Sequence, residues 1–209
     1  MKYRLVIFDM DGTLADSFPW FMTVMNSVAD KFRFRQIAPD EVETLRRLDS
    51  QRILERLDVP RWKLPLIARH MRALKAQHIA DIALFPGVDG MLHELKSRGL
   101  RIGVVSSDSE ANVRRALRGE NARRIDDYAC GASLFGKQAK FRRVLTRSGV
   151  AANDAIAIGD ELRDAQAARD LGIAFGAVAW GYTHVEALQD AKPDHVFLAM
   201  NDIVTQLTR

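Results

Sequence analysis

Residues 5–14 read Leu-Val-Ile-Phe-Asp-Met-Asp-Gly-Thr-Leu, and this stretch decides the fold of the 209-residue chain. Its four leading apolar residues are typical of a parallel strand that is buried on both faces. Asp9 and Asp11 follow directly, and their spacing places both carboxylates on one side of an extended segment. Ligands of open α/β sheets bind at the carboxyl ends of the strands, so these two acids are placed for chemistry. An Asp-Gly pair is also common in plain turns, and the motif alone does not separate the two interpretations.

The rest of the chain alternates short apolar strands with helical repeats. Apolar residues at helical spacing fill the intervals between the strands, and several of these helices end at a glycine, which favours a left-handed cap. Strand–helix alternation predicts right-handed crossovers. The sequence therefore predicts an α/β fold with a three-layer, doubly wound parallel sheet. The predicted strands are Tyr3–Phe8, Arg101–Val105, Asp127–Cys130, Ala155–Ile158, Ile173–Val178 and His195–Leu198.

One interval breaks this alternation. Between residues 16 and 85 the apolar residues recur only at helical spacing, and no strand pattern interrupts them. Phe85-Pro86-Gly87 then returns the chain to the alternating pattern. The sequence therefore predicts an all-helical insertion over residues 16–85, with residues 1–15 and 86–209 forming the α/β core.

A second acidic motif, Gly159-Asp160-Glu161-Leu162-Arg163-Asp164, follows the predicted strand Ala155–Ile158. An acid at a helix start is a common cap, which accounts for Asp160 by itself. A cap does not account for Asp164 on the same helical face, or for acids after two separate strands. Mg²⁺ accounts for both, because it binds carboxylate oxygens together with substrate phosphate and water.

Two further motifs are weaker when they are taken alone. Ser106 and Ser107 follow the predicted strand Arg101–Val105, where a serine cap would serve equally well. Gly136-Lys137 opens a predicted helix, and a lysine at such a place is usually solvated. Together, the four motifs supply two acids, a hydroxyl, an ammonium group and an acidic pair. That set can hold a phosphoryl group beside Mg²⁺ and stabilise the charge on its oxygens.

The combination resembles the haloacid dehalogenase (HAD) superfamily, and within it the phosphatases with a small helical (C1-type) cap, such as phosphoglycolate phosphatases. The resemblance rests on Asp9-Met10-Asp11-Gly12-Thr13, on the three later motifs in the family's order, and on the place of the helical insertion. It covers nearly the whole chain and implies a Rossmann-like core with a cap. The implied activity is that of a Mg²⁺-dependent phosphatase, a phosphoric monoester hydrolase that works through an aspartyl-phosphate.

The resemblance also implies catalytic and metal-binding roles. Asp9 would be the nucleophile, and Asp11 would be the general acid and then the general base. Mg²⁺ would be bound by Asp9, the Asp11 main-chain carbonyl and Asp160. Asp164 would support these ligands through water or through Lys137.

The phosphate oxygens have their own implied partners. Ser106, Ser107 and Lys137 would bind these oxygens, and Thr13 would orient the loop that carries the two acids. Lys140, one turn after Lys137, remains an alternative for the phosphate lysine. Ser107 stands where many phosphoglycolate phosphatases place asparagine, a departure that counts against that particular substrate.

Asp11 and the insertion bear on the substrate. A halide leaving group takes no proton, so a second acid indicates an oxygen leaving group, as in a phosphate ester. In such enzymes the cap contacts the leaving group, and the candidate residues near the middle of the insertion are Arg46, Arg47, Ser50 and Arg52. Arginines suit a second anion, so we expect a small anionic organophosphate. Arginines on a solvated helix are the plain alternative.

Composition and charge exclude several classes of protein. A single cysteine, Cys130, rules out an internal disulfide and any multi-cysteine metal site. No apolar run approaches the roughly 18 residues of a membrane helix, and the first apolar run is too short for a signal peptide. We therefore expect a cytoplasmic protein with no membrane partner. The net charge is +4, and the arginines of residues 114–147 fit solvated helix faces, so no nucleic-acid partner is expected.

Three other functions remain open at this stage, as does the oligomeric state. A phosphomutase of the β-phosphoglucomutase type shares all four motifs. A signalling receiver domain also combines a sheet-end aspartate with Mg²⁺, a hydroxyl and a lysine, but it lacks the insertion and the second acid. A non-catalytic binding protein on the same fold is disfavoured by the intact set of acids.

Overall fold

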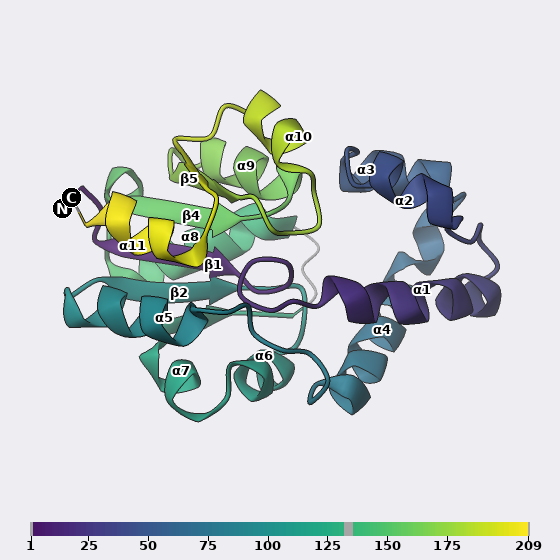
Figure 1. Cartoon of the computed structure of the whole chain (residues 1–209), viewed down its shortest axis with the longest axis horizontal. Helices are drawn as coiled ribbons and strands as arrows, with labels where there is room; N and C mark the ends of the chain where they lie inside the picture. Colours follow the sequence, from purple (N-terminus) through teal and green to yellow (C-terminus); the bar gives the residue numbers. More distant parts are fainter. Residues whose placement is uncertain (1, 132–135, 209) are drawn as a thin grey trace.

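The structure, a computed structural model, describes residues 2–131 and 136–208 (Figure 1). Its centre is a six-stranded sheet in the order β3-β2-β1-β4-β5-β6, in which neighbouring strands are parallel. The strands are β1 (Leu5–Asp9), β2 (Arg101–Val105), β3 (Asp127–Ala129), β4 (Ala155–Gly159), β5 (Ala174–Val178) and β6 (His195–Phe197). The predicted α/β fold is confirmed, and the strand ends differ from the predicted ones by at most two residues.

Helices cover both faces of the sheet, because the side chains of each strand alternate between the two faces. In β1, Val6 and Phe8 join one hydrophobic layer, whereas Leu5 and Ile7 join the other, and all four are fully buried. The first layer contains α5 (Val88–Ser97), α6 (Glu110–Leu117), α7 (Gly119–Arg124) and α11 (Met200–Leu207). The second contains α8 (Gly136–Ser148), α9 (Leu162–Arg169) and α10 (Val185–Asp190). Within the sheet, β1 lies between β2 and β4.

After β1 the chain leaves the sheet and forms four α-helices, besides two short 3-10 helices, before it returns. They are α1 (Phe18–Phe32), α2 (Val42–Leu45), α3 (Ser50–Arg56) and α4 (Leu64–His78). Residues 18–78 are termed the helical segment below. Pro19 and Pro65 occupy the first turns of α1 and α4, where a missing amide hydrogen costs nothing. The carboxylate of Asp49 caps α3 by accepting the amide of Arg52.

The helical segment packs around a hydrophobic cluster of its own, which includes Val28, Leu45 and Leu57. It lies beside the sheet, on the side where β1 ends (Figure 1). Among residues 2–131 and 136–208, no helix combines the length and the apolar character that a bilayer crossing requires.

Two neighbouring stretches of chain join the helical segment to the sheet. Ala15 and Leu84 form an antiparallel bridge, and the amide of Asp16 donates to the carbonyl of Ala83 at 2.9 Å. The outgoing and returning chains are therefore bonded to each other where they cross between the two parts.

Candidate active site

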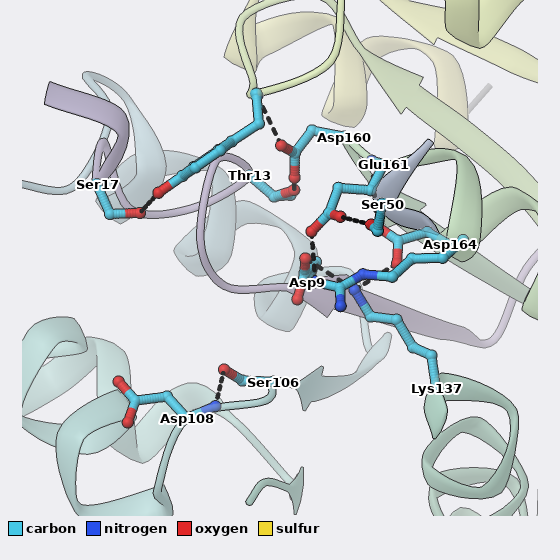
Figure 2. Close-up of polar contacts among 12 residues, drawn as sticks. Asp9, Thr13, Ser17, Ser50, Ser106, Asp108, Lys137, Asp160, Glu161 and Asp164 are labelled. Atoms are coloured by element: carbon cyan, nitrogen blue, oxygen red, sulfur yellow. Dashed lines mark hydrogen bonds and ion pairs between the residues drawn. The ribbon is translucent and has the colours of Figure 1, made fainter. Parts of the chain in front are cut away.

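Residues from four separate motifs meet at the edge of the sheet where β1, β2 and β4 end (Figure 2). Asp9 is the last residue of β1, and Asp160 directly follows β4. Ser106 directly follows β2, and Lys137 lies in the first turn of α8. The strand order causes this convergence, because β1 has β2 and β4 as its two neighbours.

Three buried carboxylates form the centre of the site. Asp9, Asp160 and Asp164, termed the acidic cluster, each offer one oxygen, and these oxygens lie within 4.8 Å of one another. Their exposed fractions are 5%, 0% and 1%. The ammonium of Lys137 pairs with Asp9 at 2.7 Å and with Asp164 (Figure 2). Lys137 offsets only part of this buried negative charge, and the rest calls for another cation.

The loops at the sheet edge fix the orientation of Asp160. The hydroxyl of Thr13 donates to one carboxylate oxygen at 2.8 Å, and the amide of Tyr182 donates to the other at 2.7 Å. Gly12 adopts a left-handed backbone with φ of +77°. A side chain at position 12 would run into the Asp160 carboxylate and the Tyr182 ring, so this close approach requires glycine.

Burial and mutual repulsion shift the pKa values of the cluster. Burial raises the pKa of Asp160 well above its usual range, and the nearby Asp9 carboxylate raises it further. Burial also raises the pKa of Asp164 to about 7, although Lys137 opposes the change. Burial alone would lower the pKa of Lys137, but Asp164 and Asp9 outweigh that effect and raise it. Ionising both Asp160 and Asp164 is therefore unfavourable without a further cation.

The donor atoms of the acidic cluster suit a hard divalent ion. The cluster offers carboxylate oxygens from three residues, all buried and close together. Mg²⁺ prefers such oxygens and keeps coordination positions for water and phosphate. The residues present therefore fit Mg²⁺ both in donor type and in their unbalanced charge.

The two serines that follow β2 have different surroundings. Ser106 is 1% exposed, and its hydroxyl accepts a hydrogen bond from the amide of Asp108 at 3.0 Å. Ser107 is exposed and faces the cavity described next. The ammonium of Lys140 donates to the main-chain carbonyl of Ser106 at 2.6 Å, and burial followed by the charge of Lys137 lowers the pKa of Lys140 to about 8. The structure thus places Lys137, and not Lys140, against the acidic cluster.

A cavity of about 460 Å³ lies between the sheet edge and the helical segment. Asp11, Ser107 and Asp108 line it from the sheet side, and mainly apolar side chains of α1, α3 and α4 line it from the other. A volume of roughly 300–1,000 Å³ is usual for small-molecule sites. The cavity can therefore hold the organic part of a small substrate next to Asp11.

Two of the four residues expected near the substrate in the helical segment line this cavity. Arg46 does so, but its guanidinium donates to the main-chain oxygens of Gly181 and Tyr182, at 3.0 Å each. Ser50 also lines the cavity and donates to the carboxylate of Glu161 at 3.1 Å. Both residues thus hold the helical segment against loops of the sheet edge.

The other two expected residues do not reach the cavity. Arg47 and Arg52 are exposed, and neither is among the described residues that line it. Asp49, which caps α3, pairs with Arg52 at 3.5 Å. For these two arginines, the solvated helix surface is the correct description.

Lys75 of α4 is the main functional candidate that the sequence analysis missed. Its side chain is buried, and its ammonium lies 2.5 Å from Asp11 Oδ1 and 3.2 Å from Asp108 Oδ2. Burial alone would lower the pKa of Lys75, but Asp11 and Asp108 raise it above its ordinary value. A signal was present, because Ile67, Met71 and Lys75 recur every four residues and share the buried side of the helix.

Arg72, one turn before Lys75, also lines the cavity. Its main-chain oxygen accepts a hydrogen bond from the Asn112 side chain at 3.2 Å, which holds α4 against α6. Within the part of the chain that the structure describes, its guanidinium forms no hydrogen bond or ion pair. Arg72 is therefore a cation that a substrate can use.

Comparisons with known proteins show the family of the chain. A sequence profile of the haloacid dehalogenase-like hydrolase family matches residues 6–178. A phosphoglycolate phosphatase of Synechococcus elongatus is 31% identical over 99% of this chain and 99% of its own length. Phosphoglycolate phosphatase 1 of Pseudomonas aeruginosa is 26% identical over 96% of this chain and 78% of its own.

Solved structures share the fold. A predicted phosphatase from Clostridium acetobutylicum superposes with a TM-score of 0.84 at 20% identity, over 100% of this chain and 99% of that one. A haloacid dehalogenase-like family hydrolase from Streptococcus pneumoniae gives a TM-score of 0.81 at 20% identity, over 98% of both chains. At this level of identity the likeness concerns the fold alone.

Proposed function

The chain belongs to the haloacid dehalogenase-like hydrolase family, and from this premise we propose that it is a Mg²⁺-dependent phosphatase that cleaves a small anionic phosphomonoester through an aspartyl-phosphate. The relatives named above place it among the phosphoric monoester hydrolases. The position of Asp9 carries the finer proposal. It ends β1 in contact with Lys137 and beside Asp160, and Asp11 stands two residues further along, at the cavity.

In the first step, a carboxylate oxygen of Asp9 attacks phosphorus and the ester bond between phosphorus and oxygen breaks. Asp11 gives its proton to the departing oxygen, because it lines the cavity that takes the organic part of the substrate. Lys137, 2.7 Å from Asp9, and Ser106, at the end of β2, provide donors for the phosphoryl oxygens.

In the second step, water attacks the phosphorus of the aspartyl-phosphate. Asp11, now a carboxylate, takes the proton of that water. The bond between phosphorus and the Asp9 oxygen breaks, so inorganic phosphate leaves and the Asp9 carboxylate is restored.

The metal would be held by Asp9, Asp160 and the main-chain carbonyl of Asp11. When bound, Mg²⁺ supplies positive charge that lets the carboxylate and the phosphate, both anions, approach each other. Thr13 and the amide of Tyr182 orient Asp160 beforehand, so little rearrangement of this ligand is needed.

The substrate follows from the cavity and from the relatives. Both of the relatives named above are phosphoglycolate phosphatases, which makes 2-phosphoglycolate the first ester to test. A carboxylate beside the phosphoester would meet Arg72, which lines the cavity on the same helix as Lys75. The helical segment would act as the cap that encloses the leaving group.

The test is phosphate release by the purified protein with Mg²⁺, from p-nitrophenyl phosphate and a panel of phosphomonoesters that includes 2-phosphoglycolate. Asp9→Asn and Asp160→Asn should each lower the rate more than about a thousandfold. Asp190→Asn, an exposed acid at the end of α10, is the matched control and should keep full activity. Borohydride reduction during turnover should convert Asp9 to homoserine, detectable by mass spectrometry. Wild-type protein that releases phosphate from no member of the panel would refute the proposal.

A further inference from the structure

One buried charge in the helical segment has no part in the steps above. Lys75 is 6% exposed, yet its ammonium contacts two carboxylates of the sheet edge, Asp11 at 2.5 Å and Asp108 at 3.2 Å. A buried ammonium is costly unless ion pairs compensate it, so the position of Lys75 depends on both acids. It is the cation of the helical segment that touches the acid–base residue.

Asp108 provides a fixed partner for this lysine. It is 3% exposed, and its second oxygen accepts hydrogen bonds from the Ser109 amide at 2.6 Å and the Asn112 side chain at 2.8 Å. The same Asn112 amide donates to the main chain of Arg72 in α4. Asp108 and Asn112 thus place α4, and with it Lys75, at a defined distance from the sheet edge.

Asp11 is less constrained than its neighbours. Its side chain is 29% exposed, in a loop after β1, whereas that of Asp9 is 7% exposed. A general acid is effective only when its proton points at the departing oxygen, and misplacement by about 1 Å can cost about a hundredfold in rate. The contact from Lys75 restrains Asp11 from the cavity side.

We propose that Lys75 is a positioning residue for Asp11: with α4 docked on the sheet edge, its ammonium donates to Oδ1 of Asp11, so that the other oxygen, which carries the proton in the first step, is held towards the leaving oxygen. The inference rests on the proposed function. In the first step the electron pair of the broken phosphorus–oxygen bond stays on the leaving oxygen, which takes the proton of Asp11. Lys75 keeps its own protons throughout and faces the resulting carboxylate.

The experiment compares two esters of similar size that carry no second anion. Benzyl phosphate has an alkoxide leaving group, which needs a proton. The leaving group of p-nitrophenyl phosphate is a p-nitrophenolate, which departs without one. Since kcat/KM reports the reaction up to the first transfer, it isolates this step. Lys75→Met should lower kcat/KM about 10- to 100-fold for benzyl phosphate and less than about threefold for p-nitrophenyl phosphate. Lys75→Arg should recover part of the loss.

Controls separate this role from a structural one. Lys31→Met, at an exposed lysine of α1, should leave both values unchanged. Asp108→Asn removes the second ion pair and should produce the same selective loss in weaker form, which keeps the test available if Lys75→Met fails to fold. If benzyl phosphate is not cleaved, the best alkyl ester of the panel replaces it. Equal losses on both esters, or no loss on either, in a folded variant would overturn the inference, whereas an inactive wild type would overturn the proposed function instead.

Discussion

Asp160 shows how single residues at the sheet edge prepare an acid to receive a cation. Both of its oxygens accept hydrogen bonds, from Thr13 and from the amide of Tyr182, while the side chain is fully buried. The hydrogen bonds orient the carboxylate, but burial and the nearby Asp9 and Asp164 carboxylates raise the pKa of Asp160. The Asp160 carboxylate is therefore oriented before a cation binds, and the bound cation would offset the repulsion from the neighbouring carboxylates.

Magnesium should therefore stabilise the protein more at about pH 8 than at about pH 5. The pKa of Asp160 is raised and that of Asp164 is about 7, so the folded protein holds protons that the unfolded chain, with its ordinary value of 3.8, has lost. This contribution to stability is complete below the ordinary value and is lost as the pH rises through the raised one. Mg²⁺ takes the place of those protons, since its ligands must be ionised.

The measurement is the melting temperature with excess MgCl₂ against EDTA at the two pH values. We expect a rise of several degrees at the higher pH and a much smaller one at the lower. Asp160→Asn should abolish the difference. An equal rise at both pH values would contradict the assignment of these acids to the cation site.

Residues of this kind were predictable where a local pattern marks them. Asp9 and Asp160 directly follow buried apolar runs, and the ends of parallel strands collect at one edge. For Lys75, helical spacing indicates only that the side chain lies on the buried side of α4; its partner Asp11 lies 64 residues away, and the docking of α4 on the sheet creates their contact. An ion pair between residues so far apart in sequence depends on the tertiary structure, so the local spacing of residues does not predict it.

Among the elements, α4 brings the helical segment into chemical contact with the sheet edge. Arg72→Met should lower kcat/KM for 2-phosphoglycolate about 10- to 100-fold, because a charge-assisted hydrogen bond to its carboxylate is lost. Ethylene glycol monophosphate, which carries a hydroxyl in place of that carboxylate, should be cleaved within about twofold of the wild-type rate. Arg47→Met, at an exposed arginine outside the cavity lining, is the matched control and should leave both esters unaffected.

Strand positions were easier to predict than helix faces. A continuous apolar run marks a strand that is covered on both sides. The observed strands differ from the predicted ones only at their ends; β1, for example, extends to Asp9, which pairs with Val105 of β2. By contrast, α3 spans only Ser50–Arg56, about two turns, which is too short for periodicity to show which side is buried. Arg52 was expected at the substrate because it lies near the middle of the insertion and could bind a second anion, but it lies on the surface.

At the scale of the whole molecule, the hydrophobic cluster of the helical segment is separate from the two layers on the sheet. Leu57, 1% exposed, lies in that cluster. Leu57→Ala should cost about 2–5 kcal/mol locally and speed amide hydrogen exchange in α1, α3 and α4. Amides of β1 and β4 should exchange as in the wild type. Leu66→Ala, at a leucine 42% exposed in α4, is the control and should change little. Faster exchange in the sheet as well would show that the two parts unfold as one.

The antiparallel bridge between Ala15 and Leu84 joins the two connecting stretches into a single junction between the helical segment and the sheet. Two crossing stretches that are bonded to each other form one junction, which would let the helical segment rotate about it once its contacts with the sheet edge are released, and which would restrain sideways sliding. A rotation back to the docked arrangement would return Lys75 to the same pair of acids, Asp11 and Asp108. The enzyme would then regain its working arrangement on every cycle without sampling wrong dockings.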